Sequence, residues 1–178
     1  MRGSGEGPRR PQAFKATSAE RAFSSRNEAL EFARRARHNL EFIVQAAGRG
    51  DDVHVVTQLT LSLLGMVVFP REKLLLEAIK ETPLSSLAKE GWPSWTITRD
   101  DSAQPTRTLG DILKHVRNAV AHGRITFTSD SRLMHEVRLL VEDCKGGSSE
   151  PYWCAEIAAP DLKTFCERFL AHIDDTIG

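Results

Sequence analysis

The sequence predicts a mainly α protein, a helical bundle with a small antiparallel β-sheet placed before the last helix. Apolar residues recur with the 3.6-residue period of amphipathic helices over most of the chain. Between the fourth and the last helical segment the period changes to two, which is typical of half-buried strands. The 178 residues are enough for one domain, and 40% hydrophobic with 27% charged residues is ordinary for a soluble globular protein.

Residues 1–24 are predicted to be a flexible tail, and residues 25–178 a single domain. The tail holds three glycines and two prolines, with five basic residues against two acidic ones. Such a stretch buries too little apolar surface to offset the entropy lost on ordering it. It is either an extension at the start of the chain, which we favour, or a segment that helps to hold an anionic partner.

Five helices are predicted, and two of them have clear start signals. Ser25 and Thr108 are each followed three residues later by an acid, which is the pattern of a capping box. The second helix is apolar nearly all round, so we expect it to lie at the centre, covered by the others. The helices are predicted over residues 26–47, 53–69, 70–81, 108–121 and 160–176.

Residues 82–107 are predicted to be irregular, with Trp92 and Trp95 packed back on the helices. A stacking role for the two indoles is the alternative. Three short strands are expected after the fourth helix, and His135 begins the apolar side of the middle one, so we expect this histidine in the core. The strands are predicted over residues 124–130, 135–143 and 152–158.

The composition narrows the range of functions. Equal numbers of basic and acidic residues, 24 each, exclude a broadly basic nucleic-acid coat protein but not a local basic site. Three cysteines without a CxxC spacing favour reduced thiols. Because no apolar run could span a membrane or form a secretory signal, we expect a cytoplasmic protein. The six histidines lack metal-ligand spacing, so we expect no metal and no cofactor.

The residues with the most informative chemistry lie at the end of the fourth predicted helix. Lys114, Asn118 and His122 share one helical face, at positions i, i+4 and i+8, and Arg117 lies beside that face. The apolar stripe of the same helix points elsewhere. We therefore expect these polar groups at the surface or at an interface.

Arg117 and His122 have the chemistry that metal-free phosphodiester cleavage needs. A guanidinium is a planar fork that matches a phosphate, and an imidazole can give or take a proton near neutral pH. Asn118 could hold the histidine ring or bind a ribose or base edge. The carboxylate cluster of a two-metal nuclease is missing nearby, because Asp111 alone does not make one.

The run from Arg117 to His122 resembles the RNxxxH signature of the HEPN superfamily, named for higher eukaryotes and prokaryotes nucleotide-binding. An apolar helix leads into the motif and Gly123 follows it directly, as in the family. The stretches 32–43 and 56–70 also look similar to a plasmid-encoded bacterial HEPN subfamily, so the resemblance covers roughly residues 26–177. The resemblance implies an all-helical core and a homodimer in which two copies of the motif form one composite site.

The resemblance further implies a metal-independent endoribonuclease of a bacterial toxin–antitoxin or anti-phage system. Arg117 would clamp the scissile phosphate, His122 would be the general acid/base and Asn118 would position the substrate or the histidine. Lys114 and Arg124 are candidate contacts to the RNA backbone. The implied partners are RNA, a second copy of the chain and an antitoxin protein, with no membrane, and cleavage would leave a 2′,3′-cyclic phosphate.

Two alternatives remain open from the sequence. One is a non-catalytic HEPN module that binds a nucleotide or a protein partner. The other is a structural helical domain in which Arg117 and His122 only pair and cap within the chain.

One feature departs from some HEPN toxins, which have a modifiable tyrosine two residues after the motif histidine. Arg124 occupies that position here, and the only tyrosine is Tyr152.

Two polar residues outside the motif have expected local roles. His115 lies four residues after Asp111, so we expect the two side chains to pair at the helix surface. Arg37 lies on the apolar stripe of the first helix. It is either an ion-paired core residue, which we favour, or a group aimed at a partner or site.

Overall fold

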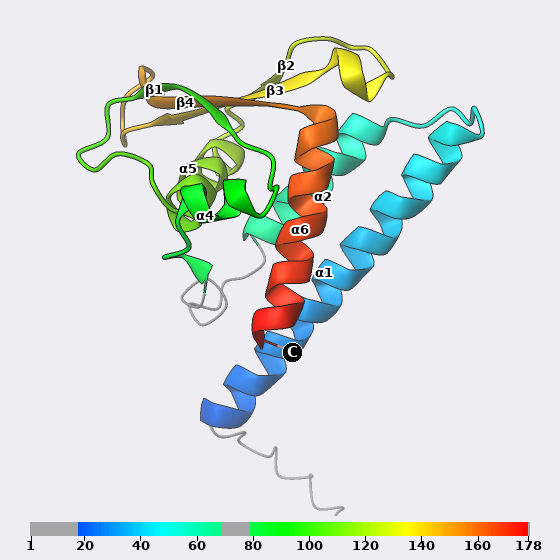
Figure 1. Cartoon of the computed structure of the whole chain (residues 1–178), viewed down its shortest axis with the longest axis horizontal. Coiled ribbons are helices and arrows are strands. Elements are labelled where there is room, and N and C mark those ends of the chain that lie inside the picture. The colour runs from blue at the N-terminus through cyan, green and yellow to red at the C-terminus, as the bar shows by residue number, and fades with distance from the viewer. Residues whose placement is uncertain (1–17, 69–78, 178) are drawn as a thin grey trace, which may run out of the picture.

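The structure is a computed structural model, and it describes residues 18–68 and 79–177. Figure 1 shows the sheet across the top of the molecule, with the helices packed below one of its faces. The elements are α1 (Ser18–Gly48), α2 (Val55–Val68), α4 (Leu84–Lys89), β1 (Thr96–Asp100), α5 (Leu109–Ala121), β2 (Ile125–Phe127), a 3-10 turn (Met134–Glu136), β3 (Arg138–Cys144), β4 (Pro151–Ala158) and α6 (Ala159–Ile177).

Helices α2, α5 and α6 agree with three of the predicted helices, whereas α1 differs from the prediction near the N-terminus. α1 begins at Ser18, so the predicted N-cap at Ser25 lies inside the helix and that start signal is wrong. The segment before Ser25 is rich in alanine and charged residues that favour helices, although its apolar residues are not periodic. Most of the predicted third helix and residues 1–17 of the predicted tail lie outside the described residues.

The sheet has four antiparallel strands in the order β1-β4-β3-β2, one more than predicted. The additional strand, β1, and the short helix α4 both lie in the segment that we expected to be irregular. β1 is an edge strand whose register shifts between Ile97 and Arg99, so its side chains do not keep a clear period of two. Its sequence therefore carries no strand signal of the kind that predicted β3 and β4.

The core lies between the inner face of the sheet and the helices. Trp153 on β4 is fully buried at its centre. Trp92 and Trp95 are also buried and pack edge-to-face on Phe165, at 5.7 and 5.8 Å between ring centroids, which confirms their expected packing role. The other large, fully buried side chains are Phe169, Leu40, Leu59, Leu63, Ile79, Leu109, Ile112, Leu139, Ile157 and Leu162.

Two predictions about single polar residues have different outcomes. Arg37 pairs with Glu41 at 2.9 Å, as expected of an ion-paired residue, but its side chain is exposed, so the expected place in the core is wrong. His135 is exposed and not in the core, because the chain there forms a 3-10 turn ahead of β3 and the strand alternation begins only at Arg138.

Within the described residues, no helix is both long and apolar enough to cross a membrane.

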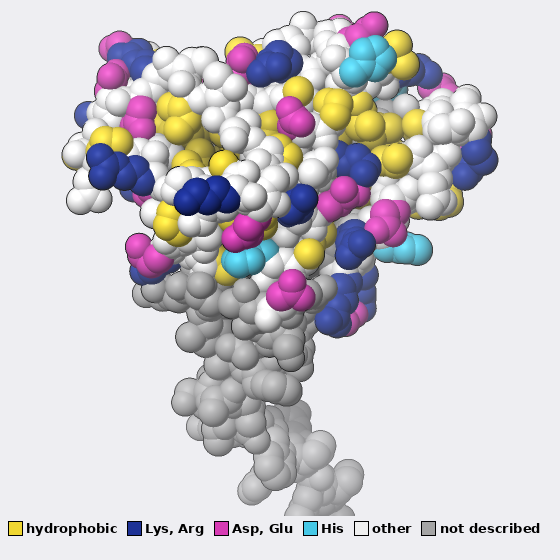
Figure 2. All heavy atoms as spheres, viewed as in Figure 1, with side chains coloured by type: hydrophobic (Ala, Val, Ile, Leu, Met, Phe, Trp, Pro, Cys, Tyr) yellow, Lys and Arg dark blue, Asp and Glu magenta, His cyan; other side chains and the backbone are white. Residues whose placement is uncertain are grey.

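Figure 2 shows Lys and Arg side chains interspersed with Asp and Glu over the described part of one face of the molecule. This face has no broad field of a single sign, in keeping with the zero net charge of the chain. An anionic ligand on this face would therefore need a local group of cations to bind.

Candidate functional site

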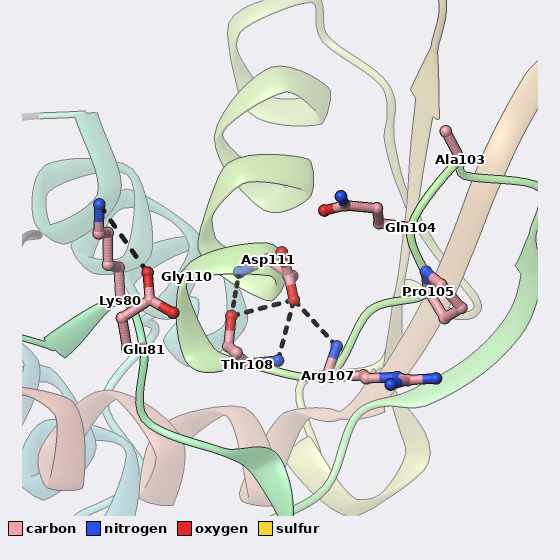
Figure 3. Close-up of a pocket in the computed structure, with 9 residues that line it drawn as sticks. All are labelled: Lys80, Glu81, Ala103, Gln104, Pro105, Arg107, Thr108, Gly110 and Asp111. Carbon is pink, nitrogen blue, oxygen red and sulfur yellow. Dashed lines mark hydrogen bonds and ion pairs between the residues drawn. The ribbon is translucent and has the colours of Figure 1, made fainter.

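The N-terminal end of α5 is fixed by a capping box, as the sequence predicts. The Thr108 hydroxyl accepts the Asp111 N–H at 3.2 Å, and the Asp111 carboxylate accepts the Thr108 N–H at 3.0 Å. Figure 3 shows these bonds beside a cavity of about 550 Å³ that lies between Lys80 and Arg107. The cavity lies at the start of α5, roughly 20 Å along the helix from the motif histidine.

The C-terminal end of α5 closes with a Schellman turn. Gly123 adopts φ +66°, a left-handed conformation that favours glycine, and its N–H bonds to Val120 O. The N–H of Arg124 reaches back to Ala119 O at 2.8 Å. His122 is the C-cap residue, so its backbone is held at the point where the chain leaves the helix for β2.

The basic side chains of the motif face are exposed. Lys114, Arg117 and His122 each lie at the surface of α5 or at its end. Within the part of the chain that the structure describes, none of the three side chains makes a hydrogen bond or ion pair. This arrangement disfavours the alternative in which Arg117 and His122 pair within the chain, and it leaves both groups able to meet a ligand.

Asn118 differs from its neighbours because it faces the protein. Its side chain is half-buried, and its Nδ2 donates to Asp143 Oδ2 on β3 at 3.0 Å. Asp143 is a buried acid, only 1% exposed. The asparagine of the motif is therefore anchored on the sheet, whereas the arginine before it and the histidine after it are exposed.

Asp143 is the centre of a polar cluster that comprises His115, Asn118, Asp143 and Tyr152. The same oxygen, Oδ2, lies 2.8 Å from His115 Nδ1 and accepts the Tyr152 hydroxyl at 2.8 Å. We infer that His115 Nδ1 carries a proton, because it faces a carboxylate. The expected surface pair of His115 with Asp111 is wrong, since His115 is buried and stacks on Trp153 at 4.5 Å between ring centroids.

The ionisation of the cluster follows from its contacts. Burial alone raises the pKa of Asp143, but the hydrogen bonds from His115, Asn118 and Tyr152 outweigh it and hold this pKa below the usual value. Burial, together with the bond to Asp143, raises the pKa of Tyr152 to about 12. At neutral pH the cluster therefore holds an ionised carboxylate and a neutral phenol that donates to it.

Asp143 and Tyr152 were not predicted as site residues, although one signal was present in the sequence. In the predicted strand 135–143, the side that carries Val137, Leu139 and Val141 ends in Asp143. An acid at an inward-facing position of a strand indicates a buried and partnered group. Its partner Asn118 lies 25 residues earlier in the chain, so the pairing itself cannot be read from local patterns.

The loop between β3 and β4 lies beside the end of the motif helix. Arg124 is half-buried, and its guanidinium reaches Ser148 O at 3.5 Å. Lys145 Nζ lies 5.7 Å from the centroid of the Tyr152 ring. The loop therefore adds an exposed cation, Lys145, next to the polar cluster, and the sequence patterns did not indicate it.

Among the described residues, no three His, Cys, Asp or Glu side chains are grouped as ligands for a metal ion.

One of three comparisons with known proteins identifies the family of the chain. No curated protein and no solved structure matches the chain. A family model described as HEPN pEK499 p136 matches residues 17–177, a range that spans every element described above and the whole motif. The chain therefore belongs to this plasmid-encoded family of the HEPN superfamily.

Proposed function

We propose that the protein is a metal-independent endoribonuclease that acts as a homodimer, with a HEPN-like helical core. The observation that carries the proposal is the exposure and pairing of the motif side chains. Arg117 and His122 are exposed and have no partner among the described residues, while Asn118 between them is tied to a buried carboxylate. An exposed, unpaired guanidinium and imidazole on a helix with both ends capped fit a site that receives a phosphodiester.

The chemistry assigned to each residue follows from its side chain. Arg117 binds the scissile phosphate and neutralises the charge that gathers on it in the transition state. His122 takes or gives the proton. Lys114 and Arg124 contact the RNA backbone. Each chain offers a single motif histidine, and proton transfer needs both a base and an acid, so the second copy of the chain supplies the other imidazole.

The setting that we propose is a bacterial toxin or anti-phage system in the cytoplasm, with an antitoxin protein as a further partner. HEPN membership supports this setting, because many members of the superfamily act as ribonucleases in such systems. Arg124 stands where some HEPN toxins have a modifiable tyrosine. We therefore expect any inhibition of this protein to use a route other than modification at that position.

Incubation of the purified protein with mixed RNA tests the proposal. We expect fragments with a 2′,3′-cyclic phosphate and a 5′-hydroxyl, formed equally well with EDTA, and their loss in the Arg117→Ala and His122→Ala variants. Matched controls are Arg107→Ala, an exposed arginine at the other end of α5, and His135→Ala, an exposed histidine on the 3-10 turn. If wild type yields no fragments but binds a nucleotide or a protein, the non-catalytic HEPN module is correct.

A further inference from the structure

We propose that Asp143 is a positioning residue of this site, which acts through Asn118 to fix the turn of α5 between Arg117 and His122. The inference rests on the proposed ribonuclease function and deepens it. Asp143 is buried and reaches the motif only through the Asn118 amide, so it touches neither the substrate nor the reacting atoms. In this assignment the motif asparagine aligns the catalytic groups and does not bind RNA.

The location of Asn118 makes it an effective anchor. It directly follows Arg117 in sequence and lies one helical turn before His122. Both of those side chains are exposed and lack partners among the described residues, so no contact of their own orients them. The backbone that carries them must therefore be held from the buried side, and the Asn118–Asp143 bond does this at 3.0 Å.

The carboxylate at the other end of this bond is itself rigidly held. His115 and Tyr152 both bond to the same oxygen, each at 2.8 Å, and His115 is stacked on the fully buried Trp153. Hydrogen bonds to an ionised carboxylate are stronger and shorter than those between neutral groups. His115 belongs to α5 itself, so Asp143 is held on the sheet by Tyr152 and bonds α5 at two positions, His115 and Asn118, of which only Asn118 lies within the motif.

A second attachment holds the far side of the same turn. The N–H of Glu142, the neighbour of Asp143 on β3, donates to Arg124 O at 3.1 Å. Arg124 in turn donates its N–H to Ala119 O at 2.8 Å. The segment that contains His122 is therefore held by β3 at both ends, through the Asn118 side chain before it and the Arg124 backbone after it.

Precise alignment matters because proton transfer and charge stabilisation depend steeply on geometry, with tolerances of roughly 0.5 Å. A variant that loosens the turn is expected to lower kcat more than it raises KM, since the cations that bind RNA remain in place. A merely structural role would lower the melting temperature and leave kcat of the folded protein unchanged. A substrate-binding role for Asn118 would instead raise KM, and Asp143 would not share in the effect.

A mutant cycle on RNA cleavage separates these roles. We expect Asp143→Asn and Asn118→Ala each to lower kcat about tenfold or more with KM within about twofold, and the double variant to be no slower than the slower single variant. This non-additivity follows because Asn118 is the link from Asp143 to the turn between Arg117 and His122, whereas the other bond from Asp143 to α5, at His115, lies before that turn. The matched control is Asp111→Asn, the same chemical change at the other end of α5, which should lower the melting temperature without changing kcat.

Multiplicative effects of the two substitutions, or an unchanged kcat in Asp143→Asn, would overturn the inference while the ribonuclease function stands. An inactive wild type would overturn the proposed function, and the inference with it. If Asp143→Asn fails to fold, Tyr152→Phe takes its place in the cycle, because it removes a single donor from the carboxylate. It should lower kcat more mildly at constant KM, and it should have no effect in the Asn118→Ala background.

Discussion

The Asn118 side chain donates a 3.0 Å hydrogen bond to Asp143, and this bond joins the motif helix α5 to strand β3. Asn118 lies on a helix, where side chains repeat about every 3.6 residues, and Asp143 lies on a strand, where they alternate every two residues. Each residue faces the protein from its own element. The bond connects the motif to a buried group of ionised and neutral partners whose titration can be measured. The polar cluster behind the motif can therefore be followed by measuring stability and tyrosine absorbance against pH, as well as by measuring activity.

Acid should destabilise the protein, because folding lowers the pKa values of two aspartates. Hydrogen bonds outweigh the effect of burial and hold the pKa of Asp143 below its usual value and that of Asp100 at about 2. Because the folded pKa is below the unfolded value near 3.9, the stabilisation is present above about pH 4 and is lost as the pH falls through the folded values. Urea unfolding between pH 7 and pH 2 should show this fall, and Asp143→Asn should make it shallower. An equal free energy of unfolding at pH 7 and pH 2 would mean that these hydrogen bonds do not favour the ionised carboxylates.

Tyr152 offers a direct optical measure of the polar cluster, because it is the only tyrosine in the chain. Burial and the bond to Asp143 raise its pKa to about 12, above the ordinary value near 10. Phenolate absorbance near 295 nm should therefore rise with a midpoint near pH 12 in the wild type. In Asp143→Asn the midpoint should move downward, since the neighbouring negative charge is removed. A wild-type midpoint near 10 would mean that the phenol faces water.

The end of α5 should depend on one glycine. Gly123 has φ +66°, where a side chain costs roughly 1–2 kcal/mol, although a Cβ there would meet open space. Gly123→Ala should lower the melting temperature by roughly 2–8 °C, measured by circular dichroism. Gly48→Ala is the matched control, because Gly48 also has open space around it and lies within α1, where alanine is favoured over glycine. An equal response of the two variants would show that backbone strain is not the cause.

What could be predicted from the sequence was local. The capping box at Thr108, the end of the fourth predicted helix at residue 121 and the exposure of Arg117 depend on neighbours within one or two turns, and the structure agrees with all three. The misassigned His115 shows where such patterns fail. A partner four residues away suggested a surface pair, but the buried carboxylate of Asp143 on a distant strand binds the ring instead.

The longer elements were predicted more easily than the short ones for a related reason. β3 and β4 alternate over seven and eight residues, which is enough for a clear period of two. β1 is a five-residue edge strand with a register shift, and α4 is a six-residue helix, so neither has a regular pattern of buried positions. β1 pairs with β4 and α4 buries Leu87, and neither of these tertiary contacts can be read from the local sequence.

The assembly prediction follows from the number of motif histidines. Each chain supplies one His122, and the proposed reaction needs an acid and a base, so two chains must bring their motifs together. Light scattering at micromolar concentration should give a dimer for the wild type and for His122→Ala, because the exposed imidazole is not needed for folding. A monomer that still cleaves RNA would mean that the site is complete within one chain.

The mechanism makes the sharpest prediction. The internal nucleophile available to a metal-free ribonuclease is the ribose 2′-hydroxyl, which RNA has and DNA lacks. A neutral His122 would remove its proton, while the protonated His122 of the second copy would donate to the leaving 5′ oxygen. Because histidine titrates near neutral pH and the two copies must be in opposite states, the rate should rise and then fall with pH around neutrality. A single 2′-deoxy substitution at the scissile position should block cleavage, whereas the same substitution one nucleotide further along should not. Cleavage of single-stranded DNA as well as RNA, or its loss on addition of EDTA, would show that this mechanism is wrong even though the chain is a HEPN protein.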